Sequence, residues 1–251
     1  MKTIAIINQK GGVAKTTSTI NLAAYLALEG KKTLIIDLDP QGNATSGLGV
    51  NRFDLPRCLY DALIDGLSFR DVLLKTKIKN LDLLPATISL AGAEIEMVNM
   101  DNREHLLKRI VDEITGYDFI LIDCPPSLGL LTINALTASD QYIVPIQCEY
   151  YALEGLGQLL KTVDLIKRGL NPDLELSGAL MTMYNSTLNL SSQVVAEVRA
   201  FFKDKVFDTV IPRSVRLSEA PSYGEAISTY APTSKGAIAY AALAKEVIKR
   251  G

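Results

Sequence analysis

The segment NQKGGVAKTT, from Asn8 to Thr17, follows a short apolar run and holds two lysines and two adjacent glycines. Gly11 and Gly12 let the backbone approach an anion closely, so that its free N–H groups can converge on phosphate oxygens. Lys15 can reach the outer phosphates of a nucleotide, and the hydroxyl of Thr16 can ligate Mg²⁺. The segment therefore predicts a phosphate-binding loop between a strand and a helix.

Two positions depart from the strict loop pattern G-x-x-x-x-G-K-[ST]. Ala14 replaces the last glycine, and Gln9 replaces the first. If the backbone at Ala14 takes a positive φ, alanine costs about 1 to 2 kcal/mol relative to glycine. Lys10 is one lysine more than phosphate binding requires, and it is either a catalytic group or a solvated loop residue.

Three carboxylates follow apolar runs that read as strands. Asp37 and Asp39 end LIIDLD, and Asp123 ends FILID. A carboxylate at such a place can support Mg²⁺ or position an attacking water, although a single one is weak evidence because carboxylates also open turns. Three such carboxylates, in order along one chain, favour a magnesium-nucleotide centre.

The elements that must position these residues alternate along the chain. Short β-rich runs such as TIAIIN, KTLIID and YDFILID are separated by longer segments of helical period. This alternation predicts an α/β fold of the P-loop NTPase type, with a mostly parallel twisted sheet and helices on both faces. Residues 205–212 (KVFDTVIP) predict a further strand, residues 41–55 a loop, and residues 1–251 a single domain.

Composition limits the classes of function. Of the 251 residues 48% are apolar, the net charge is −2, and nucleic-acid binding would therefore need a local basic patch. The three cysteines, Cys58, Cys124 and Cys148, form no C-x-x-C pair, so neither a disulfide framework nor a zinc site is indicated. Neither a secretory signal nor a membrane-spanning run is present, and a reducing, cytoplasmic location is expected.

The loop K-G-G-V-x-K-T-T resembles that of the deviant Walker-A ATPases, which include ParA/Soj partition proteins, MinD and nitrogenase reductase. The segments DPQGNATSGLG, DCPPSLGLLTINALTASD and IPRSVRLSEAPSYG further resemble chromosomal ParA/Soj proteins, and the resemblance covers nearly the whole chain. It implies an ATPase that hydrolyses Mg·ATP slowly, dimerises around ATP, binds double-stranded DNA without sequence preference, and is released by a ParB-like centromere-binding partner. Localisation at the nucleoid would follow.

The resemblance assigns roles to residues. The loop residues implied to bind nucleotide are Lys10, Gly11, Gly12, Val13, Ala14, Lys15, Thr16 and Thr17. Thr16, Asp37 and Asp123 are implied for the metal, and Lys10, Lys15 and Asp39 for catalysis, with Asp39 positioning water. Lys10 is implied to reach the partner's ATP, where a cation can stabilise charge on the transferred phosphoryl group. Asn185 and Pro212 are implied to line the adenine pocket.

A basic segment supports the implied DNA contact. Residues 199–216 hold five cations and two aspartates, and the candidates for phosphate contacts are Arg199, Lys203, Arg213 and Arg216. A solvated helix face is the alternative reading of the charges. Where the family often has a second DNA-contacting arginine, this chain has Thr187.

Other classes fit less well. A MinD-like membrane-cycling ATPase needs an amphipathic C-terminal helix, but the end GAIAYAALAKEVIKRG has only a modest apolar stripe and no large aromatic anchor. Metal-cluster carriers need paired or interface cysteines in suitable places, and none is evident in this sequence. A dinucleotide dehydrogenase needs G-x-G-x-x-G after the first strand, and the sequence has none there. The sequence does not distinguish a chromosome from a plasmid as cargo.

Overall fold

A seven-stranded sheet organises the computed structural model, which describes residues 1–150, 152–153 and 155–250. The strand order is β3-β4-β2-β5-β1-β6-β7, and the pairings are parallel except that of β3 with β4. The strands are β1 (Lys2–Ile6), β2 (Thr33–Asp37), β3 (Leu74–Lys75), β4 (Leu81–Leu84), β5 (Phe119–Asp123), β6 (Gln141–Gln147) and β7 (Glu175–Thr182). The predicted α/β fold with a mostly parallel sheet is confirmed.

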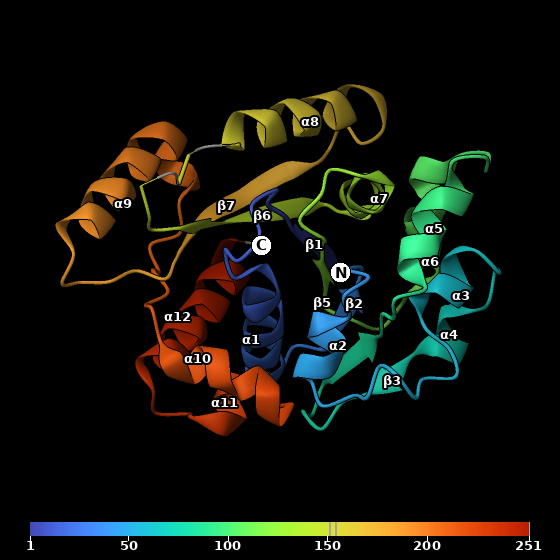
Figure 1. The fold of residues 1–251 in the computed structure, drawn as a ribbon, viewed down its shortest axis with the longest axis horizontal. Helices are drawn as coiled ribbons and strands as arrows, with labels where there is room; N and C mark the ends of the chain where they lie inside the picture. Colours follow the sequence, from blue (N-terminus) through green and yellow to red (C-terminus); the bar gives the residue numbers. More distant parts are fainter. Residues whose placement is uncertain (151, 154, 251) are drawn as a thin grey trace.

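Helices cover both faces of this sheet (Figure 1). The α-helices in the described ranges are α1 (Lys15–Leu28), α2 (Asn43–Gly47), α3 (Leu59–Leu63), α4 (Phe69–Val72), α5 (Leu90–Met97), α6 (Leu106–Glu113), α7 (Leu130–Ala138), α8 (Leu156–Gly169), α9 (Asn189–Phe202), α10 (Val215–Glu219), α11 (Ile227–Tyr230) and α12 (Lys235–Arg250). Short 3₁₀ turns occupy η1 (Arg103–His105), η2 (Lys203–Lys205) and η3 (Ala220–Tyr223).

The two-residue repeat of β-strands explains why the central strands are apolar throughout. In β1, Ile4 and Ile6 belong to a core with α1 and α12, whereas Ala5 and the following Ile7 belong to a core with α5, α6, α7 and α8. Successive side chains point to opposite faces, so a strand covered on both sides needs an apolar residue at every position.

The register of the central strands brings the candidate residues together. Ile6, the last residue of β1, pairs with Asp123 of β5, and Asp123 also pairs with Asp37 of β2. Because these strands are parallel, their carboxyl ends meet at one edge of the sheet. The phosphate-binding loop and both strand-end carboxylates therefore lie at that edge.

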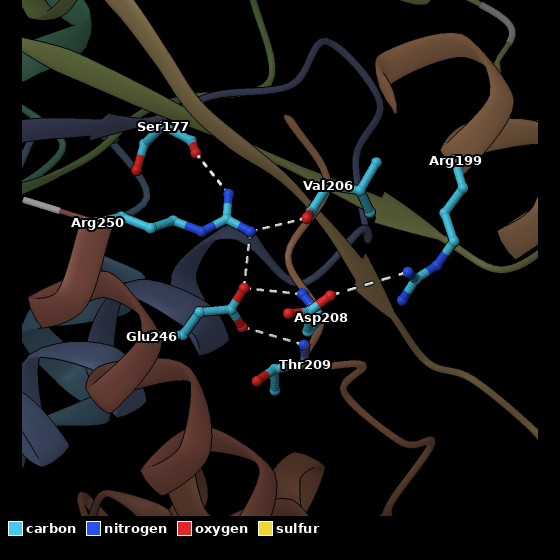
Figure 2. A network of polar contacts seen from close by, with 7 residues as sticks. All are labelled: Ser177, Arg199, Val206, Asp208, Thr209, Glu246 and Arg250. Atoms are coloured by element: carbon cyan, nitrogen blue, oxygen red, sulfur yellow. Dashed lines mark hydrogen bonds and ion pairs between the residues drawn. The ribbon is translucent and has the colours of Figure 1, made fainter. Parts of the chain in front are cut away.

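The strand predicted over residues 205–212 is absent. Its backbone bridges β7 at Val206 and bridges Tyr184, just beyond β7, at Pro212. The N–H groups of Phe207 and Ile211 also donate to carbonyls of β7. The carboxylate of Glu246 in α12 accepts hydrogen bonds from the N–H groups of Asp208 and Thr209, which a strand would give to its neighbour (Figure 2). A side chain far along the sequence therefore interrupts, at Asp208 and Thr209, the pairing that the apolar pattern predicted.

The loop predicted over residues 41–55 contains the short helix α2. Its start is fixed by Asp37, whose Oδ2 accepts hydrogen bonds from the N–H and the hydroxyl of Thr45, each at 2.7 Å. A five-residue helix is too short to show a periodic pattern, so no pattern in the sequence indicated it.

Candidate active site

The phosphate-binding loop is open to an anion at its backbone. Gly12 and Ala14 take positive φ values of 75° and 69°, and Ala14 precedes the first turn of α1. None of the N–H groups of residues 11–17 donates a hydrogen bond to another residue that the structure describes. Since these groups lie at a helix N-terminus, they form an anion-binding cradle.

Several contacts hold the loop in this shape. The Lys15 Nζ reaches back across the loop to the carbonyl oxygen of Lys10, at 3.3 Å, and the hydroxyl of Thr182 donates to the carbonyl of Val13, at 3.1 Å. Asn8 accepts a hydrogen bond from the N–H of Lys10 and donates to Pro145 in β6. The loop is thus tied to two neighbouring strands, β6 and β7.

Lys15 is the buried cation of the site, with 7% of the residue exposed. Burial lowers the pKa of Lys15, and the charges of Asp123, Cys124 and Asp39 oppose this shift. A triphosphate in the cradle would place negative charge beside the ammonium group and favour its charged form. The position fits the predicted role of Lys15 at the outer phosphates.

Asp123 lies fully buried beside the first turn of α1. Thr19 donates its hydroxyl to Asp123 Oδ1 at 3.0 Å, whereas Oδ2 is buried without a hydrogen-bond partner in the described part of the chain. Burial and the nearby Asp37 raise the pKa of Asp123, while the hydroxyls of Thr16 and Thr19 oppose the rise. A buried carboxylate oxygen with no donor is a place where a cation or its water shell fits.

Asp37 is held by the protein itself. Its Oδ2 accepts the two hydrogen bonds from Thr45, and its Oδ1 accepts one from the N–H of Asp39, at 3.3 Å. Burial raises the pKa of Asp37 to about 6, against the effect of these donors. The geometry fits an anchor of the loop after β2, and the predicted contact of Asp37 with the metal stays a prediction.

Asp39 faces the cavity in front of the loop. Its Oδ1 accepts a hydrogen bond from the N–H of Gln41 at 2.9 Å, which fixes the carboxylate at the start of the turn. The cavity has a volume of about 410 Å³, and its lining includes Gly11, Gly12, Ala14, Lys15, Thr16, Thr17 and Asp39. A carboxylate across from the cradle is placed to orient water near a terminal phosphate.

A second cavity of about 150 Å³ adjoins the loop on the side of α10. Ala14, Thr17, Pro212 and Tyr240 lie among its lining residues. Pro212 is thus beside the loop, as the adenine-pocket prediction requires. Asn185 lies outside this lining and accepts hydrogen bonds from the N–H and hydroxyl of Thr187, so its role stays a prediction.

Lys10 lies half-buried at the mouth of the site. Its backbone is fixed by Asn8, but its ammonium group makes no hydrogen bond or ion pair with the residues described here. Lys15 instead spans the loop. The predicted catalytic role of Lys10 stays a prediction.

The predicted DNA-binding arginines already have acidic neighbours. Arg213 pairs with Glu149 at 2.8 Å and Arg216 with Glu219 at 3.0 Å, whereas Arg199 and Asp208 are 3.9 Å apart. All three arginine side chains are about half exposed. Lys203 follows α9 with a positive φ of 53°. DNA phosphates would have to compete with the carboxylates for these cations.

Three threonines of the site escaped the sequence analysis: Thr19, Thr45 and Thr182. Each uses its hydroxyl to fix a carboxylate or a loop carbonyl. Thr19 lies four residues after Lys15 and therefore on the same face of α1. Helix spacing could have indicated this placement, but not those of Thr45 and Thr182.

The cradle, the buried lysine and the strand-end carboxylates, on a parallel sheet, define a P-loop ATPase with the second-lysine form of the loop. Residues 1–176 match a family model described as an AAA domain. The chain is 58% identical to the sporulation initiation inhibitor protein Soj of Bacillus subtilis, over all of this chain and 99% of that one. It is 53% identical to the chromosome partitioning protein ParA of Myxococcus xanthus, over 98% of this chain and 88% of that one.

A solved structure agrees with these sequence matches. Cobyrinic acid a,c-diamide synthase of Mycobacterium smegmatis, with bound ADP and magnesium, superposes with a TM-score of 0.88 at 39% identity, over 99% of this chain and 94% of that one. The chain belongs to the ParA/Soj family of chromosome-partitioning ATPases.

Proposed function

We propose that this protein is an ATP-driven DNA-segregation switch that works as a homodimer around Mg·ATP. The observation that carries the proposal is Lys10 beside the phosphate cradle, because its ammonium group has no hydrogen-bond or ion-pair partner among the residues that the structure describes. Identity to Soj and ParA proteins along almost the whole chain supports a role in partitioning.

Each residue of the site has its own proposed role in binding or hydrolysing Mg·ATP. The N–H groups of residues 11–17 and Lys15 bind the phosphates, and Thr16 and Asp123 would hold Mg²⁺. The ion, when bound, draws negative charge from the phosphate oxygens. Asp39 orients the attacking water, and Lys10 reaches the phosphates held by the partner subunit, where it stabilises developing charge.

Because ATP hydrolysis is slow, its rate sets the lifetime of the ATP-bound dimer. The dimer binds double-stranded DNA through Arg199, Lys203, Arg213 and Arg216 without reading base sequence, because all four groups are cations suited to phosphates. A ParB-like centromere-binding partner stimulates hydrolysis and releases the dimer from DNA at the nucleoid.

DNA binding measured with ATP, with ADP and without nucleotide, across a salt series, tests this proposal. We expect binding with ATP alone and a steep loss of affinity as salt rises. Equal binding with ADP would contradict an ATP-operated switch.

A MinD-like cycle on membranes is the competing function, and α12 argues against it. Its apolar residues Tyr240, Leu243 and Val247 are buried against the sheet and α1, and Tyr240 shares a hydrogen bond of 3.0 Å with Ser18. Arg250 further fixes the helix through the carbonyls of Ser177 and Val206 (Figure 2). Within the described ranges no helix has the length and apolarity to cross a bilayer. Sedimentation with liposomes and ATP should leave the protein in solution.

A further inference from the structure

A basic cavity lies at the end of the sheet opposite the nucleotide site. It has a volume of about 410 Å³, and Lys32, Lys75 and Lys79 lie in its wall with one carboxylate, Asp82. Lys32 precedes β2, and the other residues come from β3, β4 and the turn between them. β2 spans five residues, so this cavity and the carboxyl end of β2 are roughly 16 Å apart along the strand.

Lysines outnumber carboxylates around this cavity, where the carboxylates are Asp82 and Asp118, which accepts a hydrogen bond from the backbone N–H of Lys32 at 2.8 Å. Lys75 pairs with Asp82 at 2.7 Å, and Asp82 also accepts a hydrogen bond from Tyr117. The ammonium groups of Lys32 and Lys79 form no ion pair with any residue in the described ranges. Lys31 and Lys77 flank them in sequence, and the five lysines form what we call the lysine patch. Such a concentration of cations contrasts with a chain whose net charge is −2.

The lysine patch differs from the arginine surface proposed above. Arg199, Arg213 and Arg216 each pair with a carboxylate, whereas in the described ranges only Lys75 of the five lysines forms an ion pair. The two surfaces are also far apart in the fold. β3 is one edge strand of the sheet, while the bridge at Val206, after α9, lies along β7 at the other edge (Figure 1).

The chemistry of the patch favours phosphates over an acidic peptide. Peptide docking relies on apolar or aromatic anchors, and the exposed large apolar side chains of the described residues all lie outside residues 30–32, 74–82 and 115–118. Lysine ammonium groups are hydrogen-bond donors without acceptors, which suits phosphodiester oxygens.

We propose that the lysine patch is a second binding surface for the nucleic-acid backbone, separate from the arginine surface. This inference rests on the proposed DNA-binding function. The patch contacts phosphates of a distant stretch of the same duplex or of another duplex, with Lys32 and Lys79 facing one phosphate site.

The test replaces Lys32 and Lys79 by glutamine in one variant, and Lys75 is left in place so that Asp82 keeps its partner. The control variant, Lys161→Gln with Lys167→Gln on α8, loses the same charge elsewhere. Binding of a long DNA duplex with ATP is measured across a salt series. We expect the slope of log affinity against log salt to fall by about 2 for the patch variant, about 1 for each lost phosphate contact, with the control unchanged.

A patch variant whose slope equals that of the control would overturn the inference, even where Arg216→Ala still weakens DNA binding and the proposed function stands. A wild-type protein that binds no DNA with ATP would overturn both. A patch variant that loses polyglutamate binding but keeps the wild-type DNA slope would assign the surface to an acidic protein and also overturn the inference.

Discussion

At the scale of single residues, the site depends on side chains that hold the chemical groups in place. Thr45 is the clearest example, because its hydroxyl donates to Asp37 and accepts a hydrogen bond from the N–H of Ala86 at 2.9 Å. All three groups are buried. One hydroxyl therefore joins the end of β2, the start of α2 and the segment after β4.

Replacing Thr45 by valine keeps the shape of the side chain and removes this hydroxyl. We expect a loss of about 1 to 3 kcal/mol in the free energy of unfolding, because the Ala86 N–H and one Asp37 lone pair stay buried without partners. Denaturant unfolding measures the loss. Thr45→Ser keeps the hydroxyl and serves as the control; equal losses in the two variants would show that packing, and not the hydrogen bonds, matters at this position.

Asp39 is expected to act on the reaction and not on binding. In Asp39→Ala we expect phosphate release from ATP to fall by a factor of about 10² or more, which is the usual range for a group that handles a proton or water. Titration with a fluorescent ATP analogue should give an affinity close to that of the wild type. Unchanged phosphate release would remove Asp39 from the mechanism.

At the scale of elements, the start of α1 carries local strain. Ala14 takes a φ of 69° and ψ of 34°, a left-handed conformation that disfavours a side chain with Cβ. Glycine at this position would remove the strain, although glycine also gains entropy in the unfolded chain.

We therefore expect Ala14→Gly to stabilise the protein by up to about 1 kcal/mol, since strain of about 1 to 2 kcal/mol outweighs the entropy effect. Thermal or denaturant unfolding gives the value. Ala23→Gly, in the interior of the same helix, is the matched control and should destabilise by about 1 kcal/mol or more. A loss of stability in Ala14→Gly would indicate that the methyl group has a packing role.

The sequence predicted most elements and the positions of the key strand ends, because parallel strands bring Ile6, Asp37 and Asp123 to one edge. Hydrogen bonds between distant residues could not be predicted in the same way. Thr19 with Asp123 and Thr182 with Val13 are contacts that only the folded chain creates. The wrong strand at residues 205–212 has the same origin, because Glu246 takes the N–H groups of Asp208 and Thr209 and so interrupts the pairing with β7.

The assigned roles divide into those with geometric support and those without. Lys15, Thr16, Asp39, Asp123 and Pro212 lie around the cradle and its two cavities or beside its first helical turn. Asn185 and the metal contact of Asp37 remain predictions, as does the formation of a single domain by the whole chain.

At the scale of the whole molecule, the two ends of the sheet have different chemistry. The carboxyl ends of the strands carry the nucleotide site, as is usual for open parallel sheets. The amino ends carry the lysine patch, and α12 is fixed to the core by Tyr240 and Arg250. Lys10 lies at the mouth of the nucleotide site, where the proposed dimer would place a second copy of the chain.

Lys10 is proposed to complete the active site of a partner subunit. Light scattering of the wild type and of Lys10→Ala, each with ATP and with ADP, tests this role. We expect a wild-type dimer with ATP and monomers in the three other samples, while the variant still binds ATP because Lys15 and the cradle are intact. A Lys10→Ala protein that forms the same ATP-dependent dimer as the wild type would contradict it.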